Sequence, residues 1–517
     1  MSFREHVVQS LADALGALGV TMTPKQVDEV VEVPPDPKLG AYAFPCFTLA
    51  RTLRKAPPVI AADLVERLKG QPGFDEWCDA VEAVGAYVNF QLRPDALARA
   101  VLGAVLSAGE RYGAGTLGQG KRVVIDYSSP NMAKPLGVHH IRSTGIGNSL
   151  HRIYRFLGYE VVAINFLGDW GKTFGELVVA YRKWGDPAAL EAEPIKELLR
   201  VYVKFNQEVA ADPALDDQGR AAFKALEDGD PEVTTLWERF RELSISAFER
   251  IYERMGVHFD VYSGESVYAH ADEAVLAALA AKGLVAESEG ATVVELEGMP
   301  PCLLKKSDGA TLYALRDLAA AMDRWEQYRF DKSLYVVDVA QSLHFKQLFG
   351  VLGRLEAPWA DRLEHVSFGR YSFADGSMST RRGRIVFLED VFDEAVRRVR
   401  AVIAERNPEL PDAERVAEQV GVGAVLFFDL KHSRVRDITF SWEEAVNLEG
   451  DTGPYLQYTH ARIASLLRRG GWDPGAAILA QAAADLEALD APEAIALIKH
   501  LDDFGRVVER AGAENEP

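Results

Sequence analysis

The pattern of apolar and polar positions predicts a parallel sheet that a helical insertion interrupts. The runs VVIDYS (123–128) and YEVVAINF (159–166) are short and apolar, as buried strands are, and residues 141–157 between them have helical spacing. Residues 174–256 place apolar side chains three and four apart, as amphipathic helices do. The helix-like TLYALRDLAAAMDRW, the strand-like SLYVVDV and the helix-like HFKQLFGVLGRL then follow. This order predicts a doubly wound α/β domain.

The same pattern divides the chain into three predicted domains. Residues 1–112 mix helical stretches with short β-like runs such as AYVNFQL, which indicates an α+β domain, and the Gly-rich RYGAGTLGQGKR that follows is typical of a linker. Residues 121–388 carry the parallel sheet, with the insertion at about 176–256. Residues 389–517 have helical spacing and are expected to form an all-α domain. At 517 residues, more than one hydrophobic core is expected.

Composition and charge narrow the class of protein. The chain is 48% hydrophobic and has no apolar run of membrane-spanning length, so a globular protein of the cytoplasm is expected. The net charge of −20 argues against general affinity for nucleic acid, although local basic clusters occur near Arg51 and Arg468. Cys46, Cys78 and Cys302 are far apart in sequence and are expected to be buried thiols without a disulfide or zinc.

The stretch SSPNMAKPLGVHHIRSTGIG (128–147) is the first candidate for a functional site. It follows a predicted strand, at the position where doubly wound sheets bind their ligands. Lys134 lies close to a predicted helix N-terminus, which suits a phosphate or a carboxylate. His139 and His140 are adjacent and lack the spaced partners of a zinc site, so no metal site is expected. A simple helix-start turn with surface histidines is an equally good interpretation.

Tyr313 and Asp317 are the second candidate. They stand four residues apart on a predicted helix, so a phenol and a carboxylate share one face. A cationic ligand would suit that pair. From the residues alone, an ordinary amphipathic helix with a salt-bridged Asp317 is the simpler interpretation.

Seven stretches occur in a fixed order after GAYAFPCFTLARTLRKAP: IDYSSPNMAKP, RSTGIGNSLHRIYRFLGYE, NFLGDWGKTFG, PPCLLKKSDGATLYALRDLAAAMDRW, DKSLYVVDVAQSLHFKQLF, GSMSTRRGRIVFLEDV and LEGDTGPYLQYTHARI. Together they closely resemble class I arginyl-tRNA synthetases. The resemblance implies a Rossmann-type catalytic domain that makes arginyl-adenylate from arginine and ATP with Mg²⁺ and then charges tRNA. It also implies an N-terminal domain that grips the tRNA elbow, a helical anticodon-reading domain and a monomeric state.

The resemblance assigns an arginine pocket residue by residue. Asp126, Ser128 and Asn131 fall on the part that holds the backbone groups of arginine, while Tyr313 and Asp317 fall on the part that holds the guanidinium. Gln341 matches a further pocket position. A carboxylate is the expected partner of a guanidinium because the planar cation can donate two parallel hydrogen bonds to it.

The nucleotide half departs from the family pattern. The family's HxGH element aligns with Gly137, Val138, His139 and His140, so only His140 is in register. A ring at 139 is expected to obstruct the adenine, and the lost donor at 137 is expected to cost about 3 kcal/mol of transition-state stabilisation. Residues in this half are assigned as follows: Lys134, His140, Arg381 and Arg382 catalytic, and Gly137, His139, Ser377 and Met378 nucleotide-binding.

Three further departures point the same way. Asp338 replaces a glycine, Phe166 replaces a histidine, and Ser377 replaces the first lysine of the later motif. Fewer helices follow LEGDTGPYLQYTHARI than in relatives, so the anticodon domain is expected to be shortened. These departures favour a divergent paralogue with impaired ATP activation over a working arginyl-tRNA synthetase with unusual motifs. Two alternatives are an aminoacyl-tRNA-dependent transferase that forms an amide on an arginine-like molecule, and a non-catalytic protein that binds arginine or tRNA.

Overall fold

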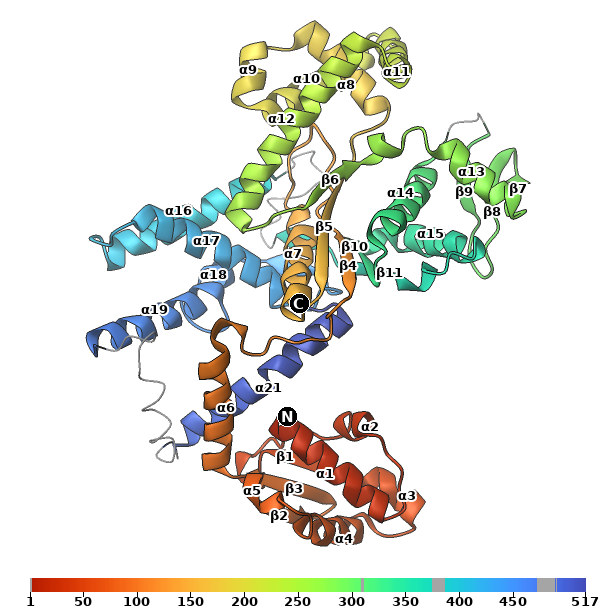
Figure 1. Ribbon diagram of the computed structural model, residues 1–517. Coiled ribbons are helices and arrows are strands. Elements are labelled where there is room, and N and C mark those ends of the chain that lie inside the picture. The colour runs from red at the N-terminus through yellow and green to blue at the C-terminus, as the bar shows by residue number, and fades with distance from the viewer. Residues whose placement is uncertain (1, 308–310, 374–385, 472–488, 490) are drawn as a thin grey trace. The chain divides into compact units, whose positions relative to one another are not determined.

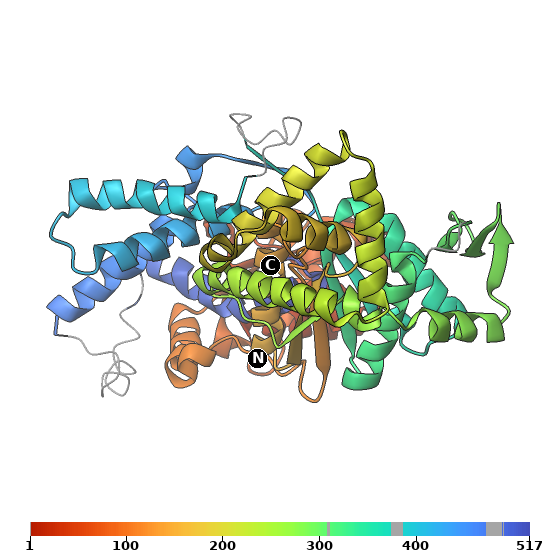
Figure 2. The same ribbon diagram turned by 90° about the horizontal axis from the view of Figure 1, so that it is seen from above.

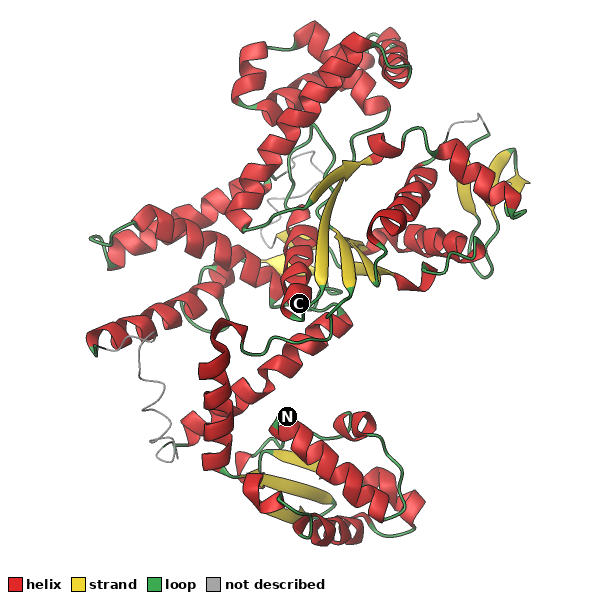
Figure 3. Cartoon of the chain, viewed as in Figure 1, coloured by secondary structure: helices red, strands yellow, loops and turns green. Residues whose placement is uncertain are grey.

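The computed structural model describes residues 2–307, 311–373, 386–471, 489 and 491–517, which fall into two compact units. The first unit comprises Met1–Gly115 and Leu467–Arg510, and the second comprises Thr116–Leu466 and Ala511–Pro517. Figure 1 labels the elements, and Figure 3 separates helices from strands by colour. This division into two units does not test the boundaries of the three domains predicted from the sequence, which remain a prediction.

A five-stranded parallel sheet forms the centre of the second unit, as the sequence predicts. Its order is β11-β10-β4-β5-β6, and all neighbouring strands are parallel. The strands are β4 (Arg122–Asp126), β5 (Glu160–Leu167), β6 (Val261–Gly264), β10 (Lys332–Asp338) and β11 (Leu363–Phe368).

Alternate residues of β4 enter different hydrophobic cores. Val123 and Ile125 belong to the core that contains α7 (His140–Phe156), whereas Val124 belongs to the core that contains α14 (Tyr313–Tyr328). The second core also contains α15 (Ser342–Arg354). Because successive side chains of a strand point to opposite faces, helices cover both sides of the sheet (Figure 1).

Five helices form the insertion between β5 and β6, where helical spacing predicts them. They gather beyond the end of the sheet at which β5 and β6 finish (Figure 1), and Figure 2 looks down on that end. They are α8 (Lys172–Trp184), α9 (Pro187–Ala192), α10 (Pro194–Val209), α11 (Ala214–Glu227) and α12 (Pro231–Met255).

A small antiparallel sheet lies between β6 and α14 in sequence, and the periodicity did not predict it. After α13 (Asp272–Ala281), the strands β7 (Val285–Ser288), β8 (Ala291–Val294) and β9 (Cys302–Lys305) pair in the order β7-β8-β9. Its buried residues Val294, Cys302 and Leu304 join the core of α14 and α15.

From Leu388 onward, the described residues form helices with one strand among them. The helices begin with α16 (Leu388–Arg406), α17 (Ala413–Leu430), α18 (Trp442–Ala445) and α19 (Gly453–Arg469). The expectation of helix throughout this region is wrong at β13 (Ile438–Phe440), which pairs in parallel with β12 (Tyr371–Phe373). Ile438 and Phe440 are buried and Thr439 between them is exposed, which is the alternation of a strand.

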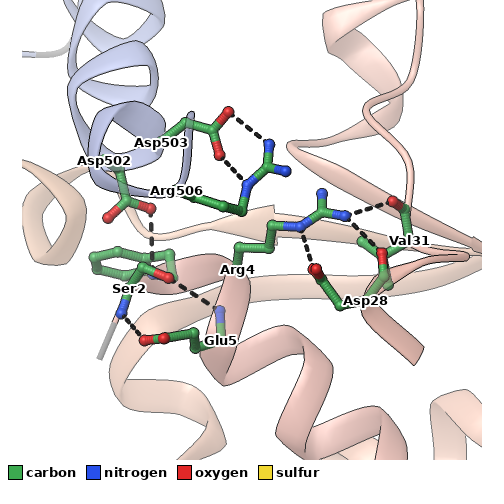
Figure 4. A network of polar contacts seen from close by, with 9 residues as sticks. Ser2, Arg4, Glu5, Asp28, Val31, Asp502, Asp503 and Arg506 are labelled. Carbon is green, nitrogen blue, oxygen red and sulfur yellow. Dashed lines mark hydrogen bonds and ion pairs between the residues drawn. The ribbon is translucent and has the colours of Figure 1, made fainter. Parts of the chain in front are cut away.

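The first unit combines the N-terminal segment Met1–Gly115 with the later segment Leu467–Arg510. It contains the sheet β1-β3-β2 (Tyr42–Pro45, Tyr87–Leu92, Cys78–Val84) and the helices α1 (Phe3–Ala17), α2 (Pro24–Asp28), α3 (Ala50–Leu53), α4 (Pro57–Lys69), α5 (Phe74–Trp77) and α6 (Pro94–Ala108). Residues 492–510 of α21 (Pro492–Glu514) complete its core, where Ile498 is buried. Figure 4 shows polar contacts at this junction, where Asp502 accepts from the backbone N–H of Phe3.

Two smaller expectations can be checked directly. Cys46, Cys78 and Cys302 are free and buried, as predicted. Among the helices that the structure describes, none is long and apolar enough to cross a bilayer.

Candidate active site

A cavity of about 550 Å³ opens at the edge of the sheet where the parallel strands end. Asp126 ends β4, Asp338 ends β10 and Phe368 ends β11, and all three line the cavity. In the sheet, β5 and β6 lie on one side of β4, and β10 and β11 lie on the other. Doubly wound sheets bind ligands at the point where the strand order changes direction in this way. The volume is in the range of small-molecule sites.

One side of this cavity, which we name the carboxylate side, is formed by Tyr313, Asp317, Gln341 and His344. Tyr313 and Asp317 stand on the first turns of α14, and the centre of the Tyr313 ring is 5.0 Å from that of His344. Asp317 Oδ2 lies 2.7 Å from His344 Nε2. The Asp317 side chain is 28% exposed, so its carboxylate stays accessible to a cation entering the cavity.

Glu265 adds a second acidic group to the same side. It begins the 3₁₀ turn Glu265–Tyr268 and pairs with Arg316 Nη1 at 2.5 Å. Burial, together with the nearby carboxylates of Asp317 and Asp169, raises the pKa of Glu265 to about 7 against the opposing effect of Arg316. Its charge therefore changes near neutral pH, and the cavity becomes more negative as pH rises.

The floor of the cavity is a buried ion pair. Arg324 Nη2 donates to Asp126 Oδ2 at 2.7 Å, and both side chains are less than 10% exposed. The guanidinium of Arg324 lies 5.2 Å from the centre of the Phe166 ring and 5.3 Å from that of Tyr335. Aromatic faces on which a cation stacks stabilise its charge away from water. Arg324 neutralises Asp126, so the negative charge available to a ligand comes mainly from the carboxylate side.

The turn after β4 has a strained backbone. Ser128 and Ser129 have φ angles of 70° and 47°, which are rare for residues other than glycine. Ser128 is buried, and its hydroxyl lies 2.7 Å from the Tyr252 hydroxyl, while Ser129 Oγ donates to Asp126 Oδ1 at 2.8 Å. These hydrogen bonds hold the turn against the sheet.

Asn131 reaches the cavity because the opposite position is a glycine. A Cβ at Gly168 would lie 2.1 Å from Asn131 Oδ1, so only glycine leaves room for this amide. The two segments are joined by backbone hydrogen bonds, from Met132 N–H to the Gly168 oxygen and from Gly168 N–H to the Pro130 oxygen.

A second side of the cavity, which we name the histidine side, is formed by His139, His140 and Asp338, while Gly137 is buried and does not line the cavity. His139 and His140 stand at the start of α7 with ring centres 4.0 Å apart. The Gly137 N–H donates to His140 Nδ1 at 3.0 Å. Burial lowers the pKa of His140 to about 3, with a further contribution from His139, so the imidazole of His140 is neutral at pH 7.

The chain just before His139 also contacts the segment that follows GSMSTRRGR. Val138 N–H donates to the Val386 oxygen, Leu388 N–H donates to the Leu136 oxygen, and Gly137 pairs with Phe387. Residues 136–138, just before α7, therefore contact residues 386–388, which lie about 250 residues further along the chain; residues 374–385 lie outside the described part of the chain.

The structure gathers most of the predicted site residues around one cavity. Its lining includes Asp126, Ser128, Asn131, His139, His140, Tyr313, Asp317 and Gln341. Lys134 is not among the lining residues, and its Nζ lies 5.8 Å from the centre of the Tyr202 ring on α10. Ser377, Met378, Arg381 and Arg382 lie outside the described residues. The roles given to all these residues remain predictions.

The lining residues that the sequence did not predict include His344, Glu265 and Arg324, each of which makes a charged or polar contact at the cavity. His344 could have been found, since it begins the helix-like HFKQLF only three residues after Gln341. Arg324 could also have been found, since it stands seven residues after Asp317 on the same predicted helix. Glu265 carries no local signal, because the fold alone brings it near Asp317.

Three family models match the chain over consecutive ranges. The model of the arginyl tRNA synthetase N terminal domain matches residues 2–92, and the model of the catalytic domain of class I (R) tRNA synthetases matches residues 101–442. The model of the DALR anticodon binding domain matches residues 456–517. The catalytic-domain match covers the parallel sheet and every described residue that lines the cavity.

Curated relatives agree with these matches. The chain is 44% identical over 511 residues to an arginine–tRNA ligase of Alkaliphilus metalliredigens, covering 98% of this chain and 88% of the relative. It is 48% identical over 447 residues to an arginine–tRNA ligase of Clostridium perfringens, covering 86% and 78%. The chain belongs to the class I arginyl-tRNA synthetase family.

Solved structures show the same architecture. The arginyl-tRNA synthetase of Thermus thermophilus matches 100% of this chain and 88% of its own, with a TM-score of 0.80 at 28% identity. The arginyl-tRNA synthetase of Plasmodium falciparum covers 99% and 88% with a TM-score of 0.79, and at 22% identity this likeness concerns the fold alone. The predicted α/β fold with a Rossmann-type sheet and a helical insertion is confirmed.

Proposed function

We propose that this chain charges tRNA with L-arginine, using ATP to form arginyl-adenylate and releasing AMP and diphosphate. The observation that carries the proposal is the accessible Asp317 carboxylate beside His344 in a cavity at the switch point of the sheet. Its negative environment suits the guanidinium of arginine, which pairs with a carboxylate through two parallel hydrogen bonds.

The cavity offers a separate contact for each end of arginine. Asp317, Tyr313 and Gln341 would hold the guanidinium on the carboxylate side. Asp126 and Asn131 would hold the backbone groups near the end of β4, which leaves the carboxylate of arginine directed toward the histidine side. Attack of that carboxylate on the α-phosphate of ATP forms the adenylate, and the 2′- or 3′-hydroxyl of tRNA then displaces AMP.

The nucleotide would lie along the histidine side with its magnesium. The N-terminus of α7, a helix of 17 residues, is oriented to stabilise phosphate charge there. Mg²⁺ would be carried mainly by the phosphate oxygens of ATP, and the described residues contain no cluster of three or more potential metal ligands. The anticodon-binding family match at residues 456–517 supports tRNA as the partner.

Charging can be tested directly on the purified chain. It is incubated with ATP, Mg²⁺, labelled arginine and total tRNA, and both AMP and acid-precipitable arginyl-tRNA are followed. Arginine-dependent charging is expected, and lysine in place of arginine should give none because an ammonium cannot reproduce the planar pairing. Binding of arginine without any AMP or arginyl-tRNA would overturn the proposal.

The expectation of a divergent paralogue remains unconfirmed. The relatives named above are arginine–tRNA ligases over most of their length, and nothing in the comparisons favours a transferase or a non-catalytic binder. The outcome of the charging experiment separates these three readings.

A further inference from the structure

Gly137 and His139 depart from the family pattern together, and they are also coupled in space. A Cβ at Gly137 would lie 2.6 Å from His139 Cε1 and 2.7 Å from His139 Nδ1. Real Cβ atoms do not approach other atoms so closely, so any side chain at 137 would collide with this ring. The imidazole of His139 therefore occupies the space in which a side chain at position 137 would begin.

The ring remains available to a ligand in that place. His139 lines the cavity and is exposed, whereas Gly137 beneath it is buried. The ring centre of His139 lies 4.0 Å from that of His140 at an interplanar angle of 39°, and the Gly137 N–H donates to His140 Nδ1. The imidazole of His139 therefore lines the cavity next to the N-terminus of α7.

The groups around His139 determine its charge. Desolvation lowers the pKa of His139, and the Asp338 carboxylate at the end of β10 opposes that shift. The imidazole of the neighbouring His140 is neutral at pH 7. His139 is then a neutral imidazole at this pH, with one N–H that can donate to a phosphate oxygen and one nitrogen that can accept.

We propose that His139 contacts the triphosphate of ATP in this chain and takes the place of the side chain that Gly137 lacks. The two substitutions then form one exchange, in which glycine at 137 makes room for an imidazole delivered from 139. This inference rests on the proposed function and reverses the expectation from sequence that a ring at 139 obstructs the nucleotide.

Three variants of the full chain test this paired substitution. The assay measures the incorporation of labelled diphosphate into ATP in the presence of arginine and tRNA. His139→Gly should lower kcat about a hundredfold, the cost of removing one transition-state donor, while KM for arginine changes less than about twofold. Gly137→His should also be impaired, because two rings would compete for one space. The double variant Gly137→His/His139→Gly should recover most of the wild-type rate. An increase in kcat for His139→Gly would overturn the proposal.

Binding measurements keep the test independent of turnover. Calorimetry with a non-hydrolysable ATP analogue should show weaker binding to His139→Gly than to the wild type and partial recovery in His139→Gln, which keeps one donor. Arginine titration of the same variants controls for folding. If the wild type neither exchanges diphosphate nor charges tRNA, the proposed function fails. If the wild type is active and His139→Gly equals it in rate and in analogue affinity, only the present inference fails.

A last readout concerns Asp338. Asp338→Asn removes the carboxylate that opposes desolvation of the imidazole, so the pKa of His139 measured by NMR should fall below its wild-type value. The lower limb of the pH–rate profile should move in the same direction. A His139 resonance that titrates identically in both proteins would show that Asp338 does not affect the charge of this imidazole.

Discussion

The two sides of the cavity differ in how their residues depend on one another. On the carboxylate side, Asp317 and His344 meet from two helices of one core, and the predicted residues have the spacing that the family resemblance implies. On the histidine side, Gly137 and His139 are each wrong for the family pattern, yet the ring of one fills the space above the other. A motif interpreted position by position treats these as two separate losses, whereas the structure shows that the two positions share one space.

The largest effect is expected on stability, at the ion pair between Arg324 and Asp126 that forms the floor of the cavity. Arg324→Met leaves Asp126 as a buried carboxylate without its cation, which should lower the free energy of unfolding by about 3–5 kcal/mol. Urea denaturation measures this change, and the double variant Arg324→Met/Asp126→Asn should recover much of the loss. Equal stability of the single and the double variant would mean that the pair is not coupled.

The next effect belongs to the carboxylate side alone. Asp317→Asn keeps the shape but removes the charge that faces the guanidinium, so KM for arginine should rise about a hundredfold with KM for ATP nearly unchanged. Glu326→Gln on the same helix is the matched control, because its pair with Arg329 is exposed. A parallel rise in KM for ATP would contradict the division into two sides.

A smaller effect concerns pH. Glu265 ionises as pH rises through about 7, which adds negative charge beside Asp317, so arginine should bind about three- to tenfold more tightly at about pH 8 than at about pH 6. Its folded pKa lies above the ordinary value of 4.5. Any stability it contributes is therefore complete below about pH 4.5 and is lost as pH rises through about 7. Calorimetric titration of wild type and Glu265→Gln checks the prediction, and the variant should lose most of the pH dependence.

The smallest effect is expected at Tyr313. This residue is 55% exposed at the start of α14, so its hydroxyl competes with water for a ligand. Tyr313→Phe should raise KM for arginine less than about fivefold, as expected for one neutral hydrogen bond. Steady-state kinetics measure KM for arginine in Tyr313→Phe and in Asp317→Asn under the same conditions. A hundredfold rise of KM in Tyr313→Phe would show that the phenol, and not the carboxylate, dominates binding on this side.

The sequence predicts the fold well because its signals are local. Buried strands such as 123–128 and the helix that follows are continuous patterns, and the order of the elements restricts the topology to a parallel sheet. The small sheet β7-β8-β9 was missed because its strands are four residues long, too short to show a period.

The candidate site could be predicted only in part. Asp317 and Asn131 lie in recognisable motifs, whereas Glu265 reaches the cavity through contacts between elements that are distant in sequence. The coupling of Gly137 with His139 depends on the direction of one side chain at the start of α7. Periodicity and composition carry no information about that direction.

The helix that completes the first unit has a consequence for synthesis on the ribosome. Ile498 and its neighbours fill a core whose other members come from residues 3–105, so the nascent N-terminal segment cannot bury all its apolar surface while translation continues. Nearly four hundred further residues must be synthesised before helix α21, which completes this core, emerges from the ribosome. A truncated product that ends before α21 would leave apolar core surface exposed, to which chaperones or other unfolded chains could bind.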